Sequence, residues 1–291
     1  MGRDVVVLPT LPEPKGVLAK ALRGLTKKPG DVATLPARTH MVMEHRVAVS
    51  RLAAYCAETG FALRDEMPAT WLHVLTFPLQ TEAMAADDFP FPLAGLVHVT
   101  NDMTLHRPLR VDEVLRVSVR AGNLQPHAKG ATFDMVGEVH VGDELVWHGT
   151  SVYLAGGARV AGDAPPPVRL AAPSVAPSQE WRLPGDLGRR YASVSGDHNP
   201  IHLNALTARL FGFPRPIIHG MWTHARAVAA LGGELPDAYR VRVQFAKPIL
   251  LPAKVGYGVV REDGQWRFAV VNREGKPHLV GELSVARRGE P

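Results

Sequence analysis

Two stretches of this chain, 140 residues apart, carry the same pattern and thereby restrict the folds that the sequence can adopt. Residues 99–121 (VTNDMTLHRPLRVDEVLRVSVRA) and 241–260 (VRVQFAKPILLPAKVGYGVV) each contain an alternating strand, a basic residue followed by proline, a turn and another alternating strand. The basic-proline pairs at 107–108 and 247–248 bring the two stretches into register. The duplication predicts two copies of one structural unit in a single chain.

Helical patterns precede the strands in each copy. A short segment that contains a tyrosine and ends at a turn comes first, RLAAYCAETGF in one copy and RRYASVSGDHN in the other. A helix that opens with proline follows at 68–84 and at 216–231. Because helices and antiparallel strands are segregated along the chain, we predict an α+β fold rather than an α/β fold.

The region between the copies, 156–178, is rich in glycine, alanine and proline and has no amphipathic period. Its three consecutive prolines favour an extended, semi-rigid spacer. We therefore divide the chain into a first domain at 1–155, a linker at 156–178 and a second domain at 179–291. Each domain is large enough for a hydrophobic core of its own.

Composition argues against several kinds of protein. No apolar run approaches the roughly 20 residues of a membrane span, and we see no signal-peptide pattern, so we expect a cytoplasmic protein without a membrane span. A single cysteine, Cys56, excludes an internal disulfide and a cysteine-rich zinc site. The net charge of +5 is scattered and does not form a basic and aromatic run, which argues against nucleic-acid binding. It suits an anionic small ligand or an acidic carrier protein.

The segment YASVSGDHNPIH, residues 191–202, concentrates side chains that can carry chemistry. Gly196 permits a sharp turn of the backbone. Asn199 followed by proline is typical of a helix start. The pattern predicts one helix from 200 to 211, which ends at Gly212.

This helix start would bring two ionisable groups together. His202 lies in the first turn, where the positive potential of the helix end favours the neutral imidazole that a general base needs. Asp197 lies just outside the same helix end, where a carboxylate is favoured. The alternative is that Asp197 and Asn199 only cap the helix and that His202 is a surface residue.

A second segment, GFPRPIIHGMWTHARAVAAL at 212–231, has the apolar content of a buried helix. Gly220, near its start, would let a ligand approach the backbone, and a free N–H there can receive a developing negative oxygen. Tight packing against a sheet would explain Gly220 equally well, and a helix cap would explain His219.

Together the two segments resemble the hydratase-2 motif of MaoC-like (R)-specific enoyl-thioester hydratases and dehydratases. The residues that carry the resemblance are the run from Tyr191 to His202, then Asn204, Gly212-Phe213 and Ile218-His219-Gly220-Met221. The match is strongest over 180–260 and weaker in the first half. The length of the chain, its linker and the order of its segments are similar to those of the actinobacterial (R)-3-hydroxyacyl-thioester dehydratases.

The resemblance implies a double hotdog, in which each half has a long helix wrapped by a curved antiparallel sheet and the halves pair as a pseudo-dimer. The first half has YCAETGF in place of Asp-x-Asn-Pro-x-His, which implies one active site per chain. The degenerate first half would then accommodate the acyl chain. The oligomeric state stays open, a homodimer included.

The activity that the resemblance implies is reversible syn hydration of trans-2-enoyl thioesters and dehydration of (R)-3-hydroxyacyl thioesters in fatty-acid metabolism. The carrier would be CoA or acyl carrier protein, and no cofactor or metal is expected. The family's catalytic groups carry onto Asp197, His202 and the backbone N–H of Gly220. Six residues are expected to contribute to substrate binding: Ser195, Asn199, His219, Arg215, Lys247 and Trp71.

Three other functions are compatible with parts of the pattern. A hotdog acyl-thioesterase would use the same scaffold but would not need Asp197 and His202 five positions apart. A non-catalytic acyl-thioester-binding module would not need the pair at all. A hydrolytic metal site could use Asp197, His198, His202 and His219, although Pro200 interrupts the helix register that would pair His198 with His202.

Overall fold

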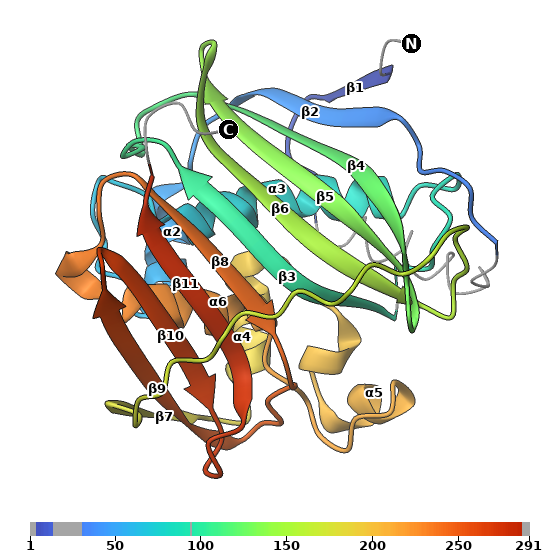
Figure 1. Cartoon of the computed structure of the whole chain (residues 1–291). Helices are drawn as coiled ribbons and strands as arrows, with labels where there is room; N and C mark the ends of the chain where they lie inside the picture. Colours follow the sequence, from blue (N-terminus) through green and yellow to red (C-terminus); the bar gives the residue numbers. More distant parts are fainter. Residues whose placement is uncertain (1–3, 14–30, 94, 287–291) are drawn as a thin grey trace. The chain divides into compact units, whose positions relative to one another are not determined.

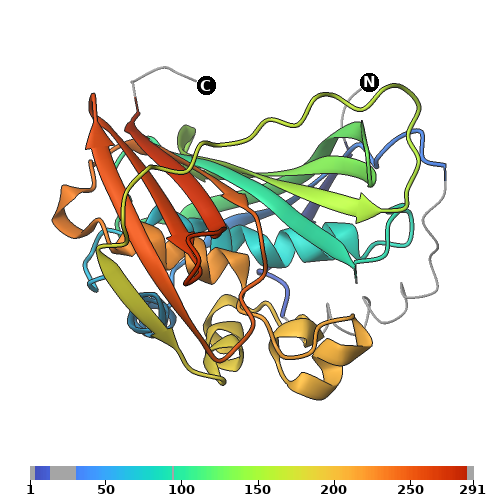
Figure 2. The ribbon, with the colours of Figure 1, turned by 60° about the horizontal axis from the view of Figure 1, so that its bottom comes forward.

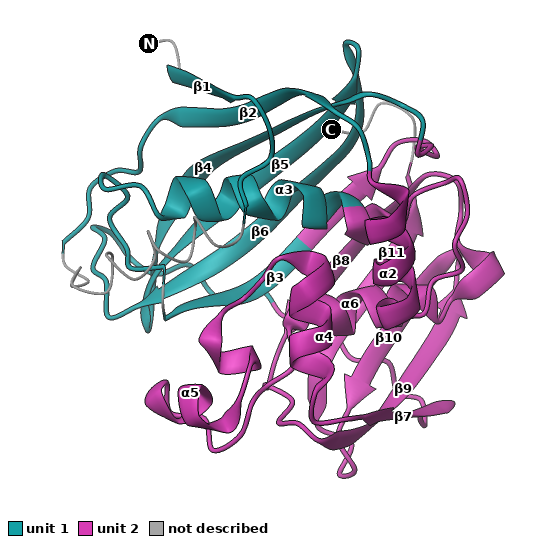
Figure 3. Cartoon of the chain, turned by 180° about the vertical axis from the view of Figure 1, so that it is seen from behind, with its two compact units in different colours: residues 1–47, 72–101, 112–168 teal, residues 48–71, 102–111, 169–291 magenta. Residues whose placement is uncertain are grey.

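A computed structural model describes residues 4–13, 31–93 and 95–286. The chain forms two compact units that interleave along the sequence (Figure 3). Unit 1 consists of Met1–Val47, Leu72–Asn101 and Asp112–Val168, and unit 2 of Ala48–Trp71, Asp102–Val111 and Arg169–Pro291. The linear division at 1–155, 156–178 and 179–291 refers to the duplicated pattern and stays a proposal.

Unit 1 is a sheet with one long helix, α3 (Ala69–Met84), whose first residues belong to unit 2. In Figure 1 the helix lies along one face of this sheet. The strands lie in the order β1-β2-β4-β5-β6-β3, with β1 parallel to β2 and antiparallel pairing from β2 through β6. Their bounds are Asp4–Leu8 (β1), Arg38–His45 (β2), Leu96–Leu105 (β3), Leu115–His127 (β4), Gly130–Val141 (β5) and Glu144–Gly156 (β6).

The core of unit 1 lies between α3 and the sheet. Along β5 buried and half-buried residues alternate, and Phe133 and Met135 are fully buried. Burial of each such side chain stabilises the fold by about 1.5–3 kcal/mol. A Cβ at Gly137 of β5 would lie 2.9 Å from Cγ2 of Thr76, so glycine lets α3 pack closely on the sheet.

The strands of unit 2 have helix α6 (Gly220–Ala229) against one face, and helix α4 (Leu187–Ser195) packs against α2 (Val49–Thr59) and η2 (Pro200–His202) (Figure 2). These strands lie in the order β8-β11-β10-β9-β7, and all of these neighbours pair antiparallel. The strand bounds are Gln179–Leu183 (β7), Tyr239–Phe245 (β8), Ala253–Glu262 (β9), Gln265–Val271 (β10) and Pro277–Val285 (β11). The helices are α2 (Val49–Thr59), α4 (Leu187–Ser195), α5 (Ala205–Leu210) and α6 (Gly220–Ala229), with 3₁₀ turns η2 (Pro200–His202) and η3 (Gly232–Glu234).

The predicted duplication is present in the topology. The order β2-β4-β5-β6-β3 in unit 1 corresponds strand for strand to β7-β9-β10-β11-β8 in unit 2. The short helices also correspond, because α2 and α4 each end at a left-handed glycine, Gly60 with φ 85° and Gly196 with φ 83°. The strands β1, β2 and β7 were not expected from the sequence pattern.

Three further features of the sequence can be compared with the structure: the region between the repeats, the absence of a membrane span and the single cysteine. Between β6 and β7 the described residues 157–178 form no helix or strand, and their role as a linker stays a proposal. In the part of the chain that the structure describes, we find no helix whose length and apolarity would allow it to cross a bilayer. Cys56 is buried, and burial raises the pKa of its thiol to about 11, which disfavours the reactive thiolate.

Candidate active site

The turn after α4 is built by hydrogen bonds between residues that are close in sequence. The Ser195 hydroxyl donates to the Tyr191 carbonyl at 2.8 Å and accepts the Asp197 N–H at 3.2 Å. The Asp197 carboxylate then accepts the Asn199 N–H at 3.1 Å. Each bond spans two to four residues, so the local sequence holds the Asp197 side chain in place at the end of α4.

The helix predicted from 200 to 211 is two separate elements, which corrects that expectation. Asn199 does act as the cap, since its side chain accepts the Ile201 N–H at 3.3 Å, but only the 3₁₀ turn η2 follows. Asn204 then starts α5 by accepting the Thr207 N–H at 2.9 Å. The physical reason is that a second capping residue competes with continuation of the first helix.

The helix predicted from 216 to 231 begins later than expected. Ile217 forms a bridge with Leu250, and the Ile218 N–H donates to the Ile249 carbonyl at 3.0 Å. These bonds hold the segment in an extended conformation, so α6 begins at Gly220 with His219 as its N-cap residue. His219 makes no side-chain cap bond, so its imidazole is available for other contacts.

The two segments bring three ionisable side chains together within unit 2. A carboxylate oxygen of Asp197 and one ring nitrogen each from His202 and His219 all lie within 4.8 Å of one another. His202 is 7% exposed and His219 is 2% exposed, whereas the Asp197 side chain is 28% exposed. Two hydrogen bonds of about 2.8 Å can span such a separation, so one water molecule could contact both the carboxylate and an imidazole.

Backbone carbonyls determine which ring nitrogens carry protons. The distance from His202 Nδ1 to the Ile217 carbonyl oxygen is 2.8 Å, and that from His219 Nε2 to the Asp197 carbonyl oxygen is 2.9 Å. A carbonyl oxygen only accepts, so both nitrogens must be the protonated donors. His202 therefore presents an unprotonated Nε2, which can accept a proton.

Burial keeps both imidazoles neutral. It lowers the pKa of His202, and it lowers the pKa of His219 to about 3, with the neighbouring His202 as the next cause. The lowered pKa of His202 agrees with the neutral imidazole expected from the sequence, but its main cause is desolvation rather than the helix end. Because His219 is neutral, its 3.8 Å contact with the Asp197 carboxylate is not an ion pair.

The geometry of the two rings argues against a metal ion between the three groups. His202 and His219 stack with centroids 3.6 Å apart and an interplanar angle of 25°. A histidine binds a metal near the plane of its ring at about 2.0–2.1 Å. The planes of the two rings are nearly parallel, so a metal ion cannot lie in both planes and also within bonding distance of a nitrogen of each ring. The arrangement therefore favours acid–base chemistry over metal binding.

Two residues to which the sequence patterns assigned no role position the site. The Ile217 carbonyl selects the tautomer of His202, and Tyr191 stacks edge-on against His219 at 5.0 Å. The run Ile217–His219 is part of the second motif segment, but its pairing with His202 depends on a contact 15 residues away in sequence. No local pattern signals such a contact.

Gly188 is a third residue that the sequence reasoning missed. A Cβ at Gly188 of α4 would lie 2.2 Å from the His202 carbonyl oxygen, and 3.2 Å from the carbonyl carbon. Both are backbone atoms, so no side-chain rotation can relieve the clash. Glycine therefore lets α4 lie directly against the turn that carries His202.

We expect Gly188→Ala to destabilise unit 2, because α4 and η2 must separate to admit the methyl group. Forced overpacking of this kind typically costs about 1–3 kcal/mol, or a fall of roughly 2–10 °C in Tm. A thermal melt followed by circular dichroism measures it. Gly185→Ala is the matched control, because its Cβ would meet only Cδ of Pro252 at an ordinary 3.8 Å. Equal melting temperatures for Gly188→Ala and the wild type would contradict this account.

Gly220 has a packing reason as well as a chemical one. As the first residue of α6 its N–H has no intrahelical partner. A Cβ there would also lie 2.9 Å from Cε1 of Phe245, so packing against β8 requires glycine too. The role of its N–H as an oxyanion donor therefore stays a prediction.

The remaining residues expected to bind substrate lie away from this cluster. Trp71 is 1% exposed and packs against Tyr55 at 5.1 Å, and the rings of Tyr55 and Tyr191 separate it from His219. Arg215 is exposed and donates to the Pro252 carbonyl at 3.4 Å. Lys247 is exposed on the turn after β8. Their substrate contacts stay predictions.

Comparison with known proteins places this site in a family. A family model described as MaoC like domain matches residues 175–281. The 3-hydroxyacyl-thioester dehydratase X of Mycobacterium tuberculosis is 39% identical over 251 residues, which cover 86% of this chain and 90% of that protein. The chain belongs to the MaoC-like dehydratase family.

Other MaoC-like proteins agree in sequence or in fold. The (R)-specific enoyl-CoA hydratase of Aeromonas caviae is 32% identical over 97 residues, covering 32% of this chain and 72% of that protein. The crystal structure of HtdX of Mycobacterium tuberculosis has a TM-score of 0.75 and 38% identity, and covers 86% of this chain and 100% of that one. A MaoC-like dehydratase of Phytophthora capsici has a TM-score of 0.71 and covers 86% of this chain and 95% of that one; at 21% identity it shows the fold alone. The predicted α+β hotdog fold is thus confirmed.

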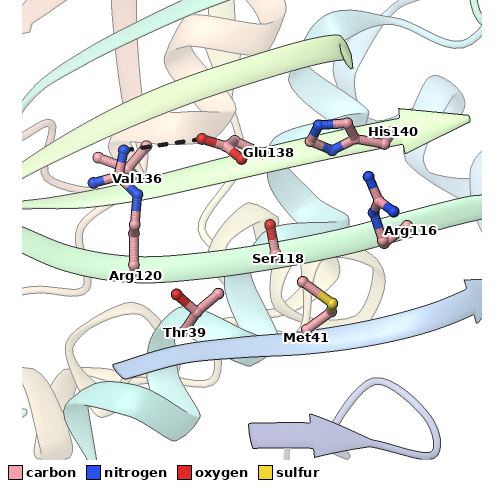
Figure 4. Close-up of a pocket in the computed structure, with 8 residues that line it drawn as sticks. All are labelled: Thr39, Met41, Arg116, Ser118, Arg120, Val136, Glu138 and His140. Carbon is pink, nitrogen blue, oxygen red and sulfur yellow. Dashed lines mark ion pairs between the residues drawn. The ribbon is translucent and has the colours of Figure 1, made fainter. Parts of the chain in front are cut away.

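Unit 1 of this MaoC-like chain has a hollow of its own, of about 380 Å³, on the sheet face of β2, β4 and β5 (Figure 4). Arg120 pairs there with Glu138 at 3.9 Å, and Arg116 approaches the exposed Asp143 at the same distance. None of the motif residues lines it. The residues that line it are Thr39, Met41, Arg116, Ser118, Arg120, Val136, Glu138 and His140.

Proposed function

We propose that this protein is a hydro-lyase that reversibly hydrates trans-2-enoyl thioesters to (R)-3-hydroxyacyl thioesters. The observation that carries the proposal is the carboxylate of Asp197 within 4.8 Å of a buried neutral imidazole whose Nε2 is unprotonated. Family membership supports it, since the relatives named above are dehydratases and a hydratase.

In the proposed mechanism Asp197 and His202 hold one water molecule between them. One of the two groups removes a proton as the water oxygen forms a bond with C3 of the substrate. A proton is delivered to C2 on the same face, and the electron pair of the double bond passes transiently to the thioester oxygen. The Gly220 N–H would donate to that oxygen, and dehydration follows the same steps in reverse.

We propose that His219 supports this pair. Its ring stacks on His202, and its Nε2–H donates to the Asp197 carbonyl, so it links the two catalytic segments. This role differs from the substrate contact expected from the sequence. Ser195 and Asn199 likewise hold the turn through the hydrogen bonds described above.

An assay with two readouts separates the proposal from its rivals. Enoyl-CoA thioesters of several chain lengths are added to the protein. We expect the enoyl absorbance to fall without release of free thiol. Chiral analysis of the product should identify the (R)-3-hydroxyacyl thioester. Release of thiol would identify an acyl-thioesterase instead. Binding of these thioesters without turnover at any chain length would identify a non-catalytic module.

The low pKa of His202 predicts the acidic limb of the pH profile. Burial lowers this pKa from its ordinary value of 6.5, so the imidazole stays neutral, and able to accept a proton, at pH 6.5. We therefore expect kcat/KM for hydration to fall only at a pH below 6.5. An acidic limb centred at or above 6.5 would argue against His202 as the proton acceptor.

Stability should depend on pH in the same direction. Below about pH 6.5 the unfolded chain binds protons that the buried His202 and His219 do not bind in the folded state. The free energy of unfolding therefore decreases as the pH falls from 6.5 toward the His219 pKa of about 3. Urea titrations at several pH values would measure this decrease.

The substrate's other parts have predicted partners. The acyl chain is expected to enter the degenerate first half, where Trp71 is a candidate contact, and a bound long-chain analogue would test this. Arg215 and Lys247 are expected near the phosphates of CoA or of the carrier protein. The predictions of a cytoplasmic location and of a homodimer also belong here as proposals.

A further inference from the structure

We call the turn from Gly196 to His202 the catalytic turn. The helix that follows it, α5, carries an exposed apolar surface. Leu206 and Leu210 of α5 are 73% and 79% exposed, and Phe211 after the helix is 37% exposed. Leu206, Arg209 and Leu210 have the i, i+3, i+4 spacing that places side chains on one face, whereas Ala208 is fully buried. We call Leu206, Arg209, Leu210 and Phe211 the α5 ridge.

Isolated apolar side chains are common on protein surfaces, but a cluster indicates a binding surface. Three of the six residues from 206 to 211 are large, apolar and exposed. Figures 1 and 3 show α5 projecting from the rest of unit 2. The ridge is therefore accessible to a partner as large as a protein.

Hydrogen bonds keep the ridge beside the catalytic turn. The Thr207 hydroxyl donates to the Pro200 carbonyl at 2.6 Å, which ties the inner side of α5 to η2. After α5, the Ile217 N–H donates to the Ile201 carbonyl at 3.1 Å and closes the loop. Since Leu206 is four residues after His202, a protein bound on the ridge would lie next to the site.

Along the chain, the residues from the end of the turn through α6 carry charge of one sign, whereas the carboxylate of Asp197 lies just before them. From His198 to Gly233 the sequence contains Arg209, Arg215 and Arg226 but no aspartate or glutamate. Within residues 4–13, 31–93 and 95–286, neither Arg209 nor Arg215 has an ion-pair partner, and Arg215 contacts only the Pro252 carbonyl at 3.4 Å. Two unpaired guanidinium groups beside apolar side chains complement an acidic protein surface with an apolar centre.

We propose that the α5 ridge docks the acidic carrier protein that delivers the acyl thioester. This inference rests on the proposed function and adds the partner of that site. A second copy of the chain is disfavoured, because an isologous contact would bring Arg209 and Arg215 against their own counterparts. A six-residue helix also offers little apolar area to a membrane surface.

The test compares two carriers of one acyl group, trans-2-octenoyl-CoA and trans-2-octenoyl acyl carrier protein. In the double variant Leu206→Ser/Leu210→Ser, and separately in Arg209→Glu, we expect KM for the carrier-protein substrate to rise about tenfold or more. We expect kcat/KM for the CoA substrate to stay within about twofold, because catalysis does not use the ridge. Leu63→Ser, at another leucine of unit 2 that is 53% exposed, is the matched control and should change neither value.

Two results would overturn the proposal. One is an unchanged KM for the carrier-protein substrate, including the case in which the variants lose binding to anionic vesicles or dimer formation instead. The other is an equal rise in KM for both substrates. Calorimetric titration with holo-acyl carrier protein measures docking without turnover. A wild type that binds this protein but hydrates neither substrate would therefore refute the proposed function and leave the docking result intact.

Discussion

Asp197→Asn should lower kcat/KM for enoyl-CoA hydration by about 10²–10⁴-fold while the chain remains folded. The amide keeps the size of the carboxylate and can still accept the Asn199 N–H that holds the turn at 3.1 Å. It cannot take or deliver a proton, so it no longer acts on a water molecule shared with His202. The enoyl absorbance assay measures the loss, and a thermal melt tests whether the fold survives.

The control for this variant is Asp186→Asn at the start of α4. Asp186 is also an aspartate of unit 2, but its side chain is 46% exposed and faces Arg190 at 3.8 Å. It has no contact with the catalytic turn that would affect a proton transfer, so activity should stay within about twofold of the wild type. Wild-type turnover by Asp197→Asn would refute the proposed catalytic pair.

His202→Gln is expected to cause a loss of similar size, because the glutamine amide has no nitrogen that accepts a proton at neutral pH. An amide NH₂ can still donate to the Ile217 carbonyl, which accepts from His202 Nδ1 at 2.8 Å, so the fold should persist. If Asp197 and His202 act on one water molecule, the double variant should lose little more activity than either single variant.

His198→Gln is the control for this second variant. His198 lies in the same turn and is half-buried, but it is outside the cluster of Asp197, His202 and His219. Its replacement should leave kcat/KM within about threefold of the wild type. Strictly additive losses in the double variant Asp197→Asn/His202→Gln would show that the two residues act in separate steps.

Much of the fold was predictable because the sequence contains it twice. The basic-proline pairs at 107–108 and 247–248 follow β3 and β8, and the strand order of unit 1 recurs in unit 2. An alternating pattern indicates a strand wherever one face is buried. The strands β1, β2 and β7 were missed, and β1 and β7 are only five residues long and mostly exposed.

The conformation of the turn from Gly196 to His202 follows from local sequence, because its hydrogen bonds join residues that are close together along the chain. The bonds at the left-handed Gly196, at the Asn199 cap and between the Asn199 N–H and Asp197 span no more than four positions. Such contacts depend on the types of residue and on their spacing, so they can be predicted from the local sequence.

The chemical environment of these residues depends instead on contacts between segments that are far apart in the sequence. The stacking of His219 on His202, the choice of tautomer by Ile217 and the close approach of Gly188 all join separate segments. The low pKa of His202 arises mainly from burial rather than from its place in a helix. Desolvation depends on which surfaces pack together. A local sequence pattern does not indicate which distant segments pack against it, so this change in pKa could not be predicted from the sequence.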